Sequence, residues 1–180
     1  MKETTLCYIK RKDDSFKGEG QREKVLMLYR NKKKKDMNQG KWIGVGGKLE
    51  PGESPEECLL REVFEETGLK ITSFKSCGQV NFILDAWEDE ITYLFTADEF
   101  EGQLVPAETY VEDNEKSVTR RFLCPEGELA WIDREYVMEL NLWEGDRLFL
   151  ENLLDEKQIN LTLHYDEDDI LVEVIDCSAK

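Results

Sequence analysis

The sequence predicts a single domain of the α+β class. A chain of 180 residues can bury one sizeable core, and its 40% apolar and 36% charged residues are typical of a soluble globular protein. Segments rich in β-favouring residues outnumber those with helical periodicity, and they occur from the first residues to the last. Because no internal repeat, linker or low-complexity stretch divides the chain, we expect one domain over residues 1–180.

The first two elements are expected to be strands. Residues 4–11 (TTLCYIKR) and 24–30 (KVLMLYR) have strand character, and the polar residues 12–23 between them contain Gly18 and Gly20. We therefore expect a hairpin across a loop. The following stretch 40–49 (GKWIGVGGKL) alternates apolar residues with glycine, which indicates a bulge or a close backbone approach, with Trp42 in the core.

Residues 55–67 are the best-defined helix of the chain. Ser54 has the properties of an N-cap, with Pro55 at the first helical position and Glu57 three residues after the cap. Gly68 is expected to end the helix. The apolar residues expected to pack into the core from this helix are Leu59, Leu60 and Val63.

The second half of the chain returns to strands. Residues 70–84 are β-favouring but broken by Gly78, residues 91–98 follow an acidic turn at 85–90, and residues 99–120 are a long polar connection. The remaining elements are a short strand at the end of 120–133, a short helix at 134–140, an amphipathic helix at 146–154 with Leu148, Phe149 and Leu153 facing the core, and a hairpin at 159–176 that turns at the acidic cluster 166–169.

Composition excludes several functional classes. The net charge of −16 argues against binding to a nucleic-acid polymer, because no basic excess exists to neutralise its backbone. The five cysteines are odd in number and contain no C-x-x-C pair, so neither a zinc site nor a disulfide framework is expected. His164 is the only histidine, which excludes histidine triads. Without a signal peptide or a bilayer-length apolar run, we expect a cytoplasmic protein without membrane contact.

A basic run, Lys32 to Lys35, interrupts this acidic chain. The simpler interpretation, slightly favoured, is a solvated loop. The alternative is a flap that meets a triphosphate or a base at the entrance of a site, which its position just before the helix permits.

Three carboxylates share one face of the helix at 55–67. Glu62, Glu65 and Glu66 lie at i, i+3 and i+4, where like charges repel each other. A hard divalent cation such as Mg²⁺, which takes carboxylates together with substrate phosphates, would offset that repulsion. Arg61 lies four residues before Glu65 and can brace it by a charge-assisted hydrogen bond. A merely solvated acidic face would not need the turn, Glu53 and the helix stop at fixed spacing as well.

Read as a pattern, residues 47–69 are G-x5-E-x7-R-E-U-x-E-E-x-G-U, where U is a bulky apolar residue. This resembles the signature of the Nudix hydrolases, with no position missing. The resemblance implies an α/β/α sandwich with a mixed β-sheet and hydrolysis of a nucleoside diphosphate linked to another moiety, with Mg²⁺ or Mn²⁺ as cofactor. By the same resemblance, Glu62, Glu65 and Glu66 bind metal, the carbonyl of Gly46 can join them, Arg61 is a bracing arginine, and Glu53 helps hold the loop. The general base stays open between Glu65, Glu66 and Glu126, and Glu126 is also a candidate metal ligand.

The resemblance extends beyond the signature. GKWIGVGGKLEPGE, LWEGD at 142–146 and the closing hairpin resemble the MutT-type 8-oxo-dGTP diphosphatases. This implies that Trp143 stacks on a purine and that Asp146 accepts hydrogen bonds from its edge. Independently of the resemblance, Lys48 is expected to meet a phosphate as a point charge, and Arg30 is a further candidate substrate ligand. The human member of that group has two adjacent aspartates where this chain has Gly145 and Asp146, and an asparagine where it has Ile43.

Three hypotheses for the function follow. The first is Mg²⁺-dependent hydrolysis of oxidised purine nucleoside triphosphates, such as 8-oxo-dGTP, to the monophosphate and pyrophosphate, by a monomer or homodimer. The second is a Nudix enzyme acting on ADP-ribose, a nucleotide sugar or a dinucleoside polyphosphate, with residues 99–120 shaping the pocket. The third is a nucleotide-sensing module without turnover, which the intact glutamate set argues against.

Overall fold

The structure, a computed structural model, describes residues 1–13, 22–104, 108–109 and 121–178. Strands dominate the chain, as predicted. In chain order the elements are β1 (Lys2–Lys12), β2 (Glu23–Arg30), β3 (Trp42–Ile43), α1 (Pro55–Thr67), β4 (Lys70–Leu84), β5 (Glu90–Glu101), β6 (Glu108–Thr109), β7 (Arg121–Cys124), β8 (Gly127–Asp133), the 3₁₀ helix η1 (Arg134–Glu139), α2 (Glu144–Leu154), β9 (Ile159–Tyr165) and β10 (Leu171–Asp176).

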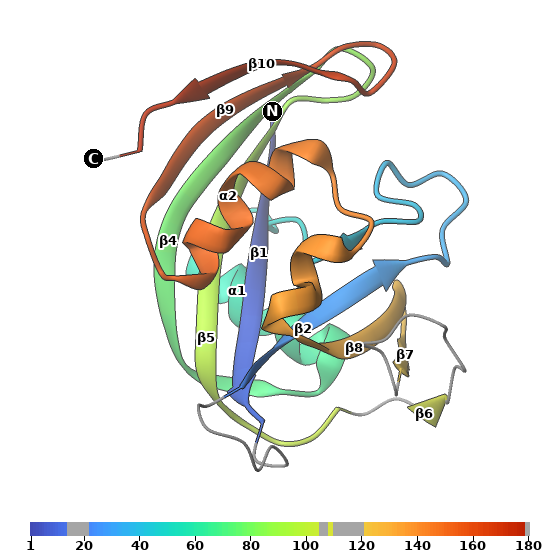
Figure 1. The fold of residues 1–180 in the computed structure, drawn as a ribbon, viewed down its shortest axis with the longest axis vertical. Helices are drawn as coiled ribbons and strands as arrows, with labels where there is room; N and C mark the ends of the chain where they lie inside the picture. The colour runs from blue at the N-terminus through green and yellow to red at the C-terminus, as the bar shows by residue number, and fades with distance from the viewer. Residues whose placement is uncertain (14–21, 105–107, 110–120, 179–180) are drawn as a thin grey trace.

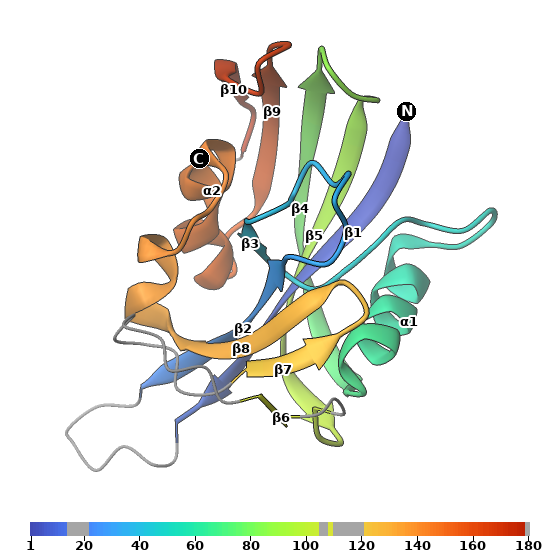
Figure 2. The same cartoon turned by 90° about the vertical axis from the view of Figure 1, so that its right-hand side faces the viewer.

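The strands form one mixed sheet with helices on both faces. Its order is β10-β9-β4-β5-β1-β2-β8-β7-β6, with β3 paired to β2. The pairs β1–β5 and β4–β9 are parallel, and the other pairs are antiparallel. Figure 2 shows α1 and α2 on opposite sides of the sheet, and in Figure 1 α2 lies in front of it and α1 behind. The predicted single-domain α+β sandwich is confirmed.

Two apolar cores explain this layering. Successive strand residues point to opposite faces, and in β1 both sets are buried. Tyr8 belongs to the core that includes Phe149 and Leu153 of α2. Cys7 belongs to the other core, with Leu59 and Val63 of α1. A central strand that is apolar on both faces needs a covering layer on each of them, and the two helices provide it.

The two predicted hairpins are present. β1 pairs antiparallel with β2, although most of the predicted loop at 12–23, namely residues 14–21, lies outside the described residues. β9 pairs antiparallel with β10 across the acidic turn at 166–169, where the backbone N–H of Asp169 donates to the carbonyl of Asp166 at 3.1 Å.

Several strand boundaries differ from the prediction. β4 is continuous from Lys70 to Leu84, because the break expected at Gly78 is a register shift between β4 and β5 rather than an end. Residues 99–101 belong to β5, and of the predicted connection residues 105–107 and 110–120 lie outside the described part of the chain. The segment 120–133 holds a hairpin of two strands, β7 and β8, instead of one strand at its end. The short helix expected at 134–140 is a 3₁₀ helix.

Two of the helix residues that were predicted to face the core do not face it. Leu60 is 40% exposed and Leu148 47% exposed, whereas Leu59, Val63, Phe149 and Leu153 are buried as predicted. Adjacent helical residues point about 100° apart, so each of these two leucines is turned out of the core by its buried neighbour. Trp42 is buried, as expected. α2 begins two residues earlier than predicted, at Glu144, with Trp143 at its N-cap.

All five cysteines are free, and four of them are buried. Of the helices in the described ranges, none combines the length and the apolar character needed to cross a membrane.

Candidate active site

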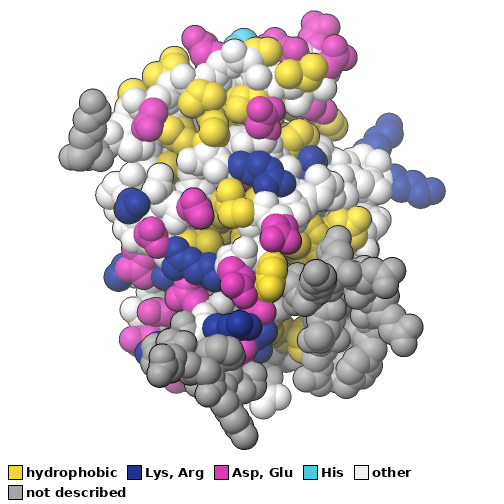
Figure 3. Space-filling view, viewed as in Figure 1, with side chains coloured by type: hydrophobic (Ala, Val, Ile, Leu, Met, Phe, Trp, Pro, Cys, Tyr) yellow, Lys and Arg dark blue, Asp and Glu magenta, His cyan; other side chains and the backbone are white. Residues whose placement is uncertain are grey.

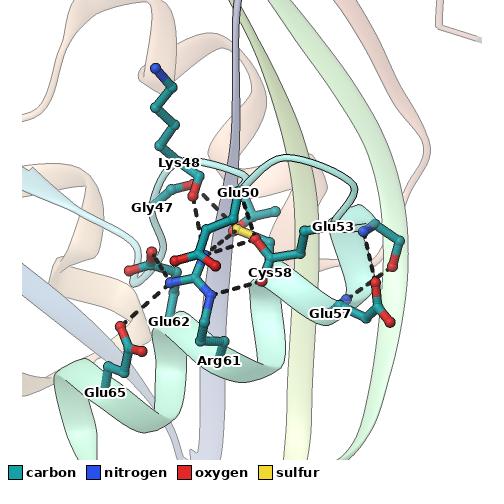
Figure 4. Close-up of polar contacts among 11 residues, drawn as sticks. Gly47, Lys48, Glu50, Glu53, Glu57, Cys58, Arg61, Glu62 and Glu65 are labelled. Carbon is teal, nitrogen blue, oxygen red and sulfur yellow. Dashed lines mark hydrogen bonds and ion pairs between the residues drawn. The ribbon is translucent and has the colours of Figure 1, made fainter.

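The ends of α1 are fixed as the sequence predicts. The Ser54 hydroxyl accepts a hydrogen bond from the backbone N–H of Glu57 at 3.2 Å, and the Glu57 carboxylate accepts one from the backbone N–H of Ser54 at 2.9 Å (Figure 4). This reciprocal capping box begins the helix at Pro55. Gly68 ends it in the left-handed region, and its N–H donates to the carbonyl of Phe64. Because both ends are fixed, the glutamates of the helix have a defined orientation.

The glycines before the helix allow the backbone to approach it closely. The carbonyl of Gly47 accepts a hydrogen bond from the N–H of Thr5 on β1 at 2.9 Å. A Cβ at Gly47 would lie 2.3 Å from the carboxyl carbon of Glu62, and one at Gly46 would lie 1.9 Å from the carbonyl oxygen of Thr5. At Gly46 the clash is with backbone, so no side chain fits there, whereas a side chain at Gly47 would have to displace the Glu62 carboxylate. The expected close backbone approach is therefore present, directly beside a candidate metal ligand.

Arg61 joins the loop and the helix glutamates. Its Nε and Nη2 donate to the two oxygens of Glu53 at 2.7 and 2.8 Å, and its Nη1 donates to Glu62 at 2.6 Å (Figure 4). The predicted bond to Glu65 is present but longer, at 3.4 Å. The Arg61 guanidinium, together with the backbone N–H of Glu50, lowers the pKa of Glu53 to about 2. Glu53 is therefore a fixed anion that orients Arg61.

Glu66 is the most buried carboxylate of α1. It is 6% exposed, and its Oε2 has no hydrogen-bond partner. Burial, together with the charge of Glu62, raises its pKa to about 8, although Arg30, the backbone of Gly46 and Lys33 oppose the rise. With this pKa the carboxyl keeps its proton at neutral pH, and a cation bound between it and Glu62 would favour the ionised form.

The three predicted metal-binding glutamates differ in exposure. The side chain of Glu62 is 17% exposed and faces Arg61, whereas that of Glu65 is 59% exposed. Within the described residues, no group of three or more His, Cys, Asp or Glu side chains is arranged to hold a metal ion. The structure thus brings Glu62 and Glu66 together and leaves Glu65 in solvent beside them.

A second charged cluster lies across from α1. Glu126, in the turn between β7 and β8, forms ion pairs with Arg30 and with Lys33, the latter at 2.6 Å. Arg30 also binds Asp36 at 2.7 Å. The residue predicted as a metal ligand or base, Glu126, and the predicted substrate ligand Arg30 are therefore paired with each other.

The lysine run divides into two parts. Lys32 donates to the carbonyl of Cys124 and Lys33 pairs with Glu126, so both contact the turn between β7 and β8. All four lysines are exposed, and within the described residues Lys34 and Lys35 make no contact of this kind with that turn, so these two differ from Lys32 and Lys33 by that contact and not by exposure. Basic side chains project at the right of Figure 3, where this segment lies. The run is therefore partly a solvated loop, as favoured, and partly a wall of the site.

One cavity of about 410 Å³ connects these groups with the second predicted site. Gly46, Glu62 and Glu126 line it, as do Trp143 and Asp146 from the start of α2. Lys48 also lines it, and its ammonium group points away from Arg61 (Figure 4). Gly46 and Glu62, which the resemblance associated with metal, thus share one cavity with Trp143 and Asp146, about 80 to 100 positions further along the chain, whereas Glu65 and Glu66 line a second pocket beside Phe64 and Cys124.

At the other end of the cavity, Trp143 is partly buried. Its indole N–H donates to Asn38 at 2.8 Å, Lys41 lies 4.8 Å from its ring centroid, and its ring meets Tyr165 edge-on at 5.7 Å. Asp146 is 4% exposed. Burial raises the pKa of Asp146 to about 7, against the charges of Lys41 and Arg147.

Sequence reasoning missed Asn38 and Tyr165, both of which line the cavity. Tyr165 ends an alternation of buried and less buried residues along β9, so the sequence pattern predicts that its side chain points inward. The proximity of Tyr165 to Trp143 could not be predicted from the sequence, because it depends on how β9 packs against α2.

Comparison with known proteins identifies the family. The model of the NUDIX domain matches residues 16–153. The chain is similar to an oxidized purine nucleoside triphosphate hydrolase of Danio rerio, with 28% identity over 142 residues that cover 78% of this chain and 80% of the relative. It is also similar to an uncharacterized Nudix hydrolase, YvcI, of Bacillus subtilis, with 29% identity over 136 residues that cover 73% of this chain and 72% of the relative.

Solved structures of MutT proteins have a similar fold. A MutT protein from Bacillus halodurans superposes with a TM-score of 0.75, at 24% identity and 97% coverage of both chains. A MutT protein from Methanosarcina mazei superposes with a TM-score of 0.59, at 27% identity, over 86% of this chain and 94% of that one. With the family model covering most of the chain and the signature intact on α1, the chain belongs to the Nudix hydrolases.

Proposed function

We propose that this Nudix hydrolase cleaves oxidised purine nucleoside triphosphates, such as 8-oxo-dGTP, to the monophosphate and pyrophosphate, with Mg²⁺ or Mn²⁺. One observation carries the proposal: a single cavity is lined by Glu62 and Glu126 at one end and by Trp143 and Asp146 at the other. Its volume of about 410 Å³ is in the range of small-ligand sites. The relatives in Danio rerio and Mus musculus that are named oxidized purine nucleoside triphosphate hydrolases support the same substrate class.

A divalent cation fits the carboxylate end on the chemistry of its donors. Glu66 presents a buried oxygen without a partner, and its repulsion with Glu62 would be relieved by a positive charge. Mg²⁺ prefers such oxygen ligands together with substrate phosphates. The residues that would hold the metal are Glu62, Glu65, Glu66, the carbonyl of Gly46 and Glu126. When bound, the cation would polarise a water molecule and neutralise charge on the phosphates.

The protein groups around this end would position the reactants. Arg61, held by the fixed anion Glu53, fixes the direction of Glu62. Arg30 and Lys33 bring two positive charges to the cavity wall, where a triphosphate would compete with Glu126 for them. Lys48 adds a third positive charge from the glycine-rich loop. The general base stays open between Glu65, Glu66 and Glu126.

At the other end, Trp143 would stack on the purine, a contact worth about 1–3 kcal/mol in comparable sites. Asp146 would bind the polar edge of the base. With a pKa of about 7 it can be present as the acid or as the anion near neutral pH, so it can donate or accept a hydrogen bond. Such a group can distinguish purines whose edges differ by one proton.

The cellular role that follows is removal of oxidised nucleotides from the precursor pool, before they enter DNA. We place this activity in the cytoplasm, in line with five free cysteines. The acidic chain would act on the free nucleotide rather than on a nucleic-acid polymer, as a monomer or homodimer.

A hydrolysis panel with Mg²⁺ tests the proposal. The substrates are 8-oxo-dGTP, dGTP, dATP, 2-hydroxy-dATP, ADP-ribose and a dinucleoside polyphosphate, with products separated by anion exchange and Glu66→Gln as the control. We expect pyrophosphate release, a preference for 8-oxo-dGTP over dGTP, and loss of activity in the variant. Activity on ADP-ribose or the dinucleoside polyphosphate alone would keep the family chemistry and overturn the substrate.

A further inference from the structure

The start of α2 lacks the capping group that helices normally carry. The first backbone N–H groups of a helix have no partner inside it, and a Ser, Thr, Asp or Asn at the N-cap usually accepts one of them. Here the N-cap is Trp143, whose side chain makes no capping hydrogen bond. The indole N–H instead binds Asn38 at 2.8 Å, and the ring lines the cavity.

Tyr165, from β9, supplies the missing acceptor. Its hydroxyl oxygen accepts a hydrogen bond from the backbone N–H of Gly145 at 2.8 Å. The tyrosine is 4% exposed, so this bond is shielded from water. The same side chain meets Trp143 edge-on, with ring centroids 5.7 Å apart and an interplanar angle of 77°. One residue therefore contacts the helix start on both sides of Glu144.

The glycine at position 145 follows from this contact. A Cβ there would lie 2.5 Å from the Tyr165 hydroxyl oxygen and 2.6 Å from Cδ1 of Leu163. These distances are far below van der Waals contact, so β9 fills the space that a side chain at 145 would need. Of residues 145 and 146, Asp146 alone can present a side chain to a base.

We infer that Tyr165 is a positioning residue for purine recognition, which caps α2 from β9 and thereby fixes Trp143 and Asp146 toward the cavity. This inference rests on the proposed function. Because the cap comes from β9, the N-cap position of α2 is free to carry the aromatic ring of Trp143. The edge-on packing of Tyr165 against Trp143 holds the indole at a fixed angle. Tyr165 acts through these two residues and takes no part in the chemistry at α1.

Tyr165→Phe tests this role, because it keeps the ring and removes only the hydroxyl. With the full chain and Mg²⁺, we expect KM for 8-oxo-dGTP to rise about two- to tenfold, as for the loss of one hydrogen bond, and the preference over dGTP to fall. We expect kcat to change little. Tyr93→Phe is the matched control, since its hydroxyl binds Glu3 at 2.8 Å on β1, away from α2, and should leave KM unchanged.

Gly145→Ala provides a second variant that probes the same contact. It should raise KM by displacing the hydroxyl, and adding it to Tyr165→Phe should give less than the product of the two single effects, because the hydroxyl is already absent. Independent effects would overturn the inference, as would an unchanged KM in Tyr165→Phe or a fall in kcat alone. A wild-type protein that cleaves no purine triphosphate would instead overturn the proposed function, and the inference with it.

Discussion

The buried carboxyl of Asp146 is expected to make the stability of the fold depend on pH. Burial raises its pKa from 3.8 to about 7. This rise corresponds to about 4 kcal/mol that disfavours the ionised form in the folded state. Because the folded pKa lies above the unfolded one, the folded chain keeps a proton that the unfolded chain has already released between these values. The contribution of Asp146 to stability is therefore complete below about pH 4 and lost as the pH rises to about 7.

Asp146→Asn keeps the shape of the side chain and cannot titrate. Urea unfolding of both proteins from pH 4.5 to pH 8 measures the difference between their free energies of unfolding. We expect this difference to move in favour of the variant by about 1.4 kcal/mol per pH unit, and to level above about pH 7. Groups shared by both proteins cancel in the difference. Glu144→Gln, an exposed neighbour on the same helix, should follow the wild-type curve. A difference independent of pH, or one that favours the wild type as the pH rises, would refute the reasoning.

Three further predictions follow from named contacts. Arg61→Ala should lower kcat by about 10- to 100-fold, as for other groups that orient metal ligands, with normal unfolding in urea; an unchanged kcat would contradict its positioning role. Leu153→Ala should lower the free energy of unfolding by about 2–5 kcal/mol, whereas Leu148→Ala, at an exposed position of the same helix, should change it by less than about 0.5 kcal/mol. Equal losses in urea unfolding would contradict the assignment of Leu153 to the buried face of α2 and of Leu148 to its exposed face. Glu156→Gln should lower the free energy of unfolding by about 1–3 kcal/mol, because it removes the negative charge that pairs with buried Lys10. Unaltered urea unfolding would show that this pair is not stabilising.

Local signals made α1 predictable in detail. The cap at Ser54, Pro55 at the first position and the stop at Gly68 all act within a few residues of the helix, so no tertiary information was needed. The same holds for the hairpin of β9 and β10, whose turn and alternation lie in one stretch. The signature fixed the spacing of Glu53, Arg61 and Glu62, and the structure places them in direct contact.

Other features depended on contacts between distant segments. The hairpin of β7 and β8 was missed because β7 has only 4 residues and the turn, at Pro125 and Glu126, is not one of the strong glycine turns. The phase of Leu60 and Leu148 was misjudged because both lie next to an equally apolar buried residue. Pairing of Arg30 with Glu126 joins positions far apart in sequence, which no local pattern indicates.

The proposed function separates the chemistry, at the glutamates of α1, from base recognition, at Trp143 and Asp146 of α2, and the kinetics of two variants test that separation directly. The measurement is the ratio of kcat/KM for 8-oxo-dGTP to kcat/KM for dGTP, in the wild type, Glu66→Gln and Asp146→Asn. Glu66→Gln is expected to lower both values by the same factor and leave the ratio unchanged, whereas Asp146→Asn is expected to change the ratio itself. If Glu66→Gln changes the ratio, or if Asp146→Asn lowers kcat/KM for both substrates by the same factor, this separation of chemistry from base recognition is wrong.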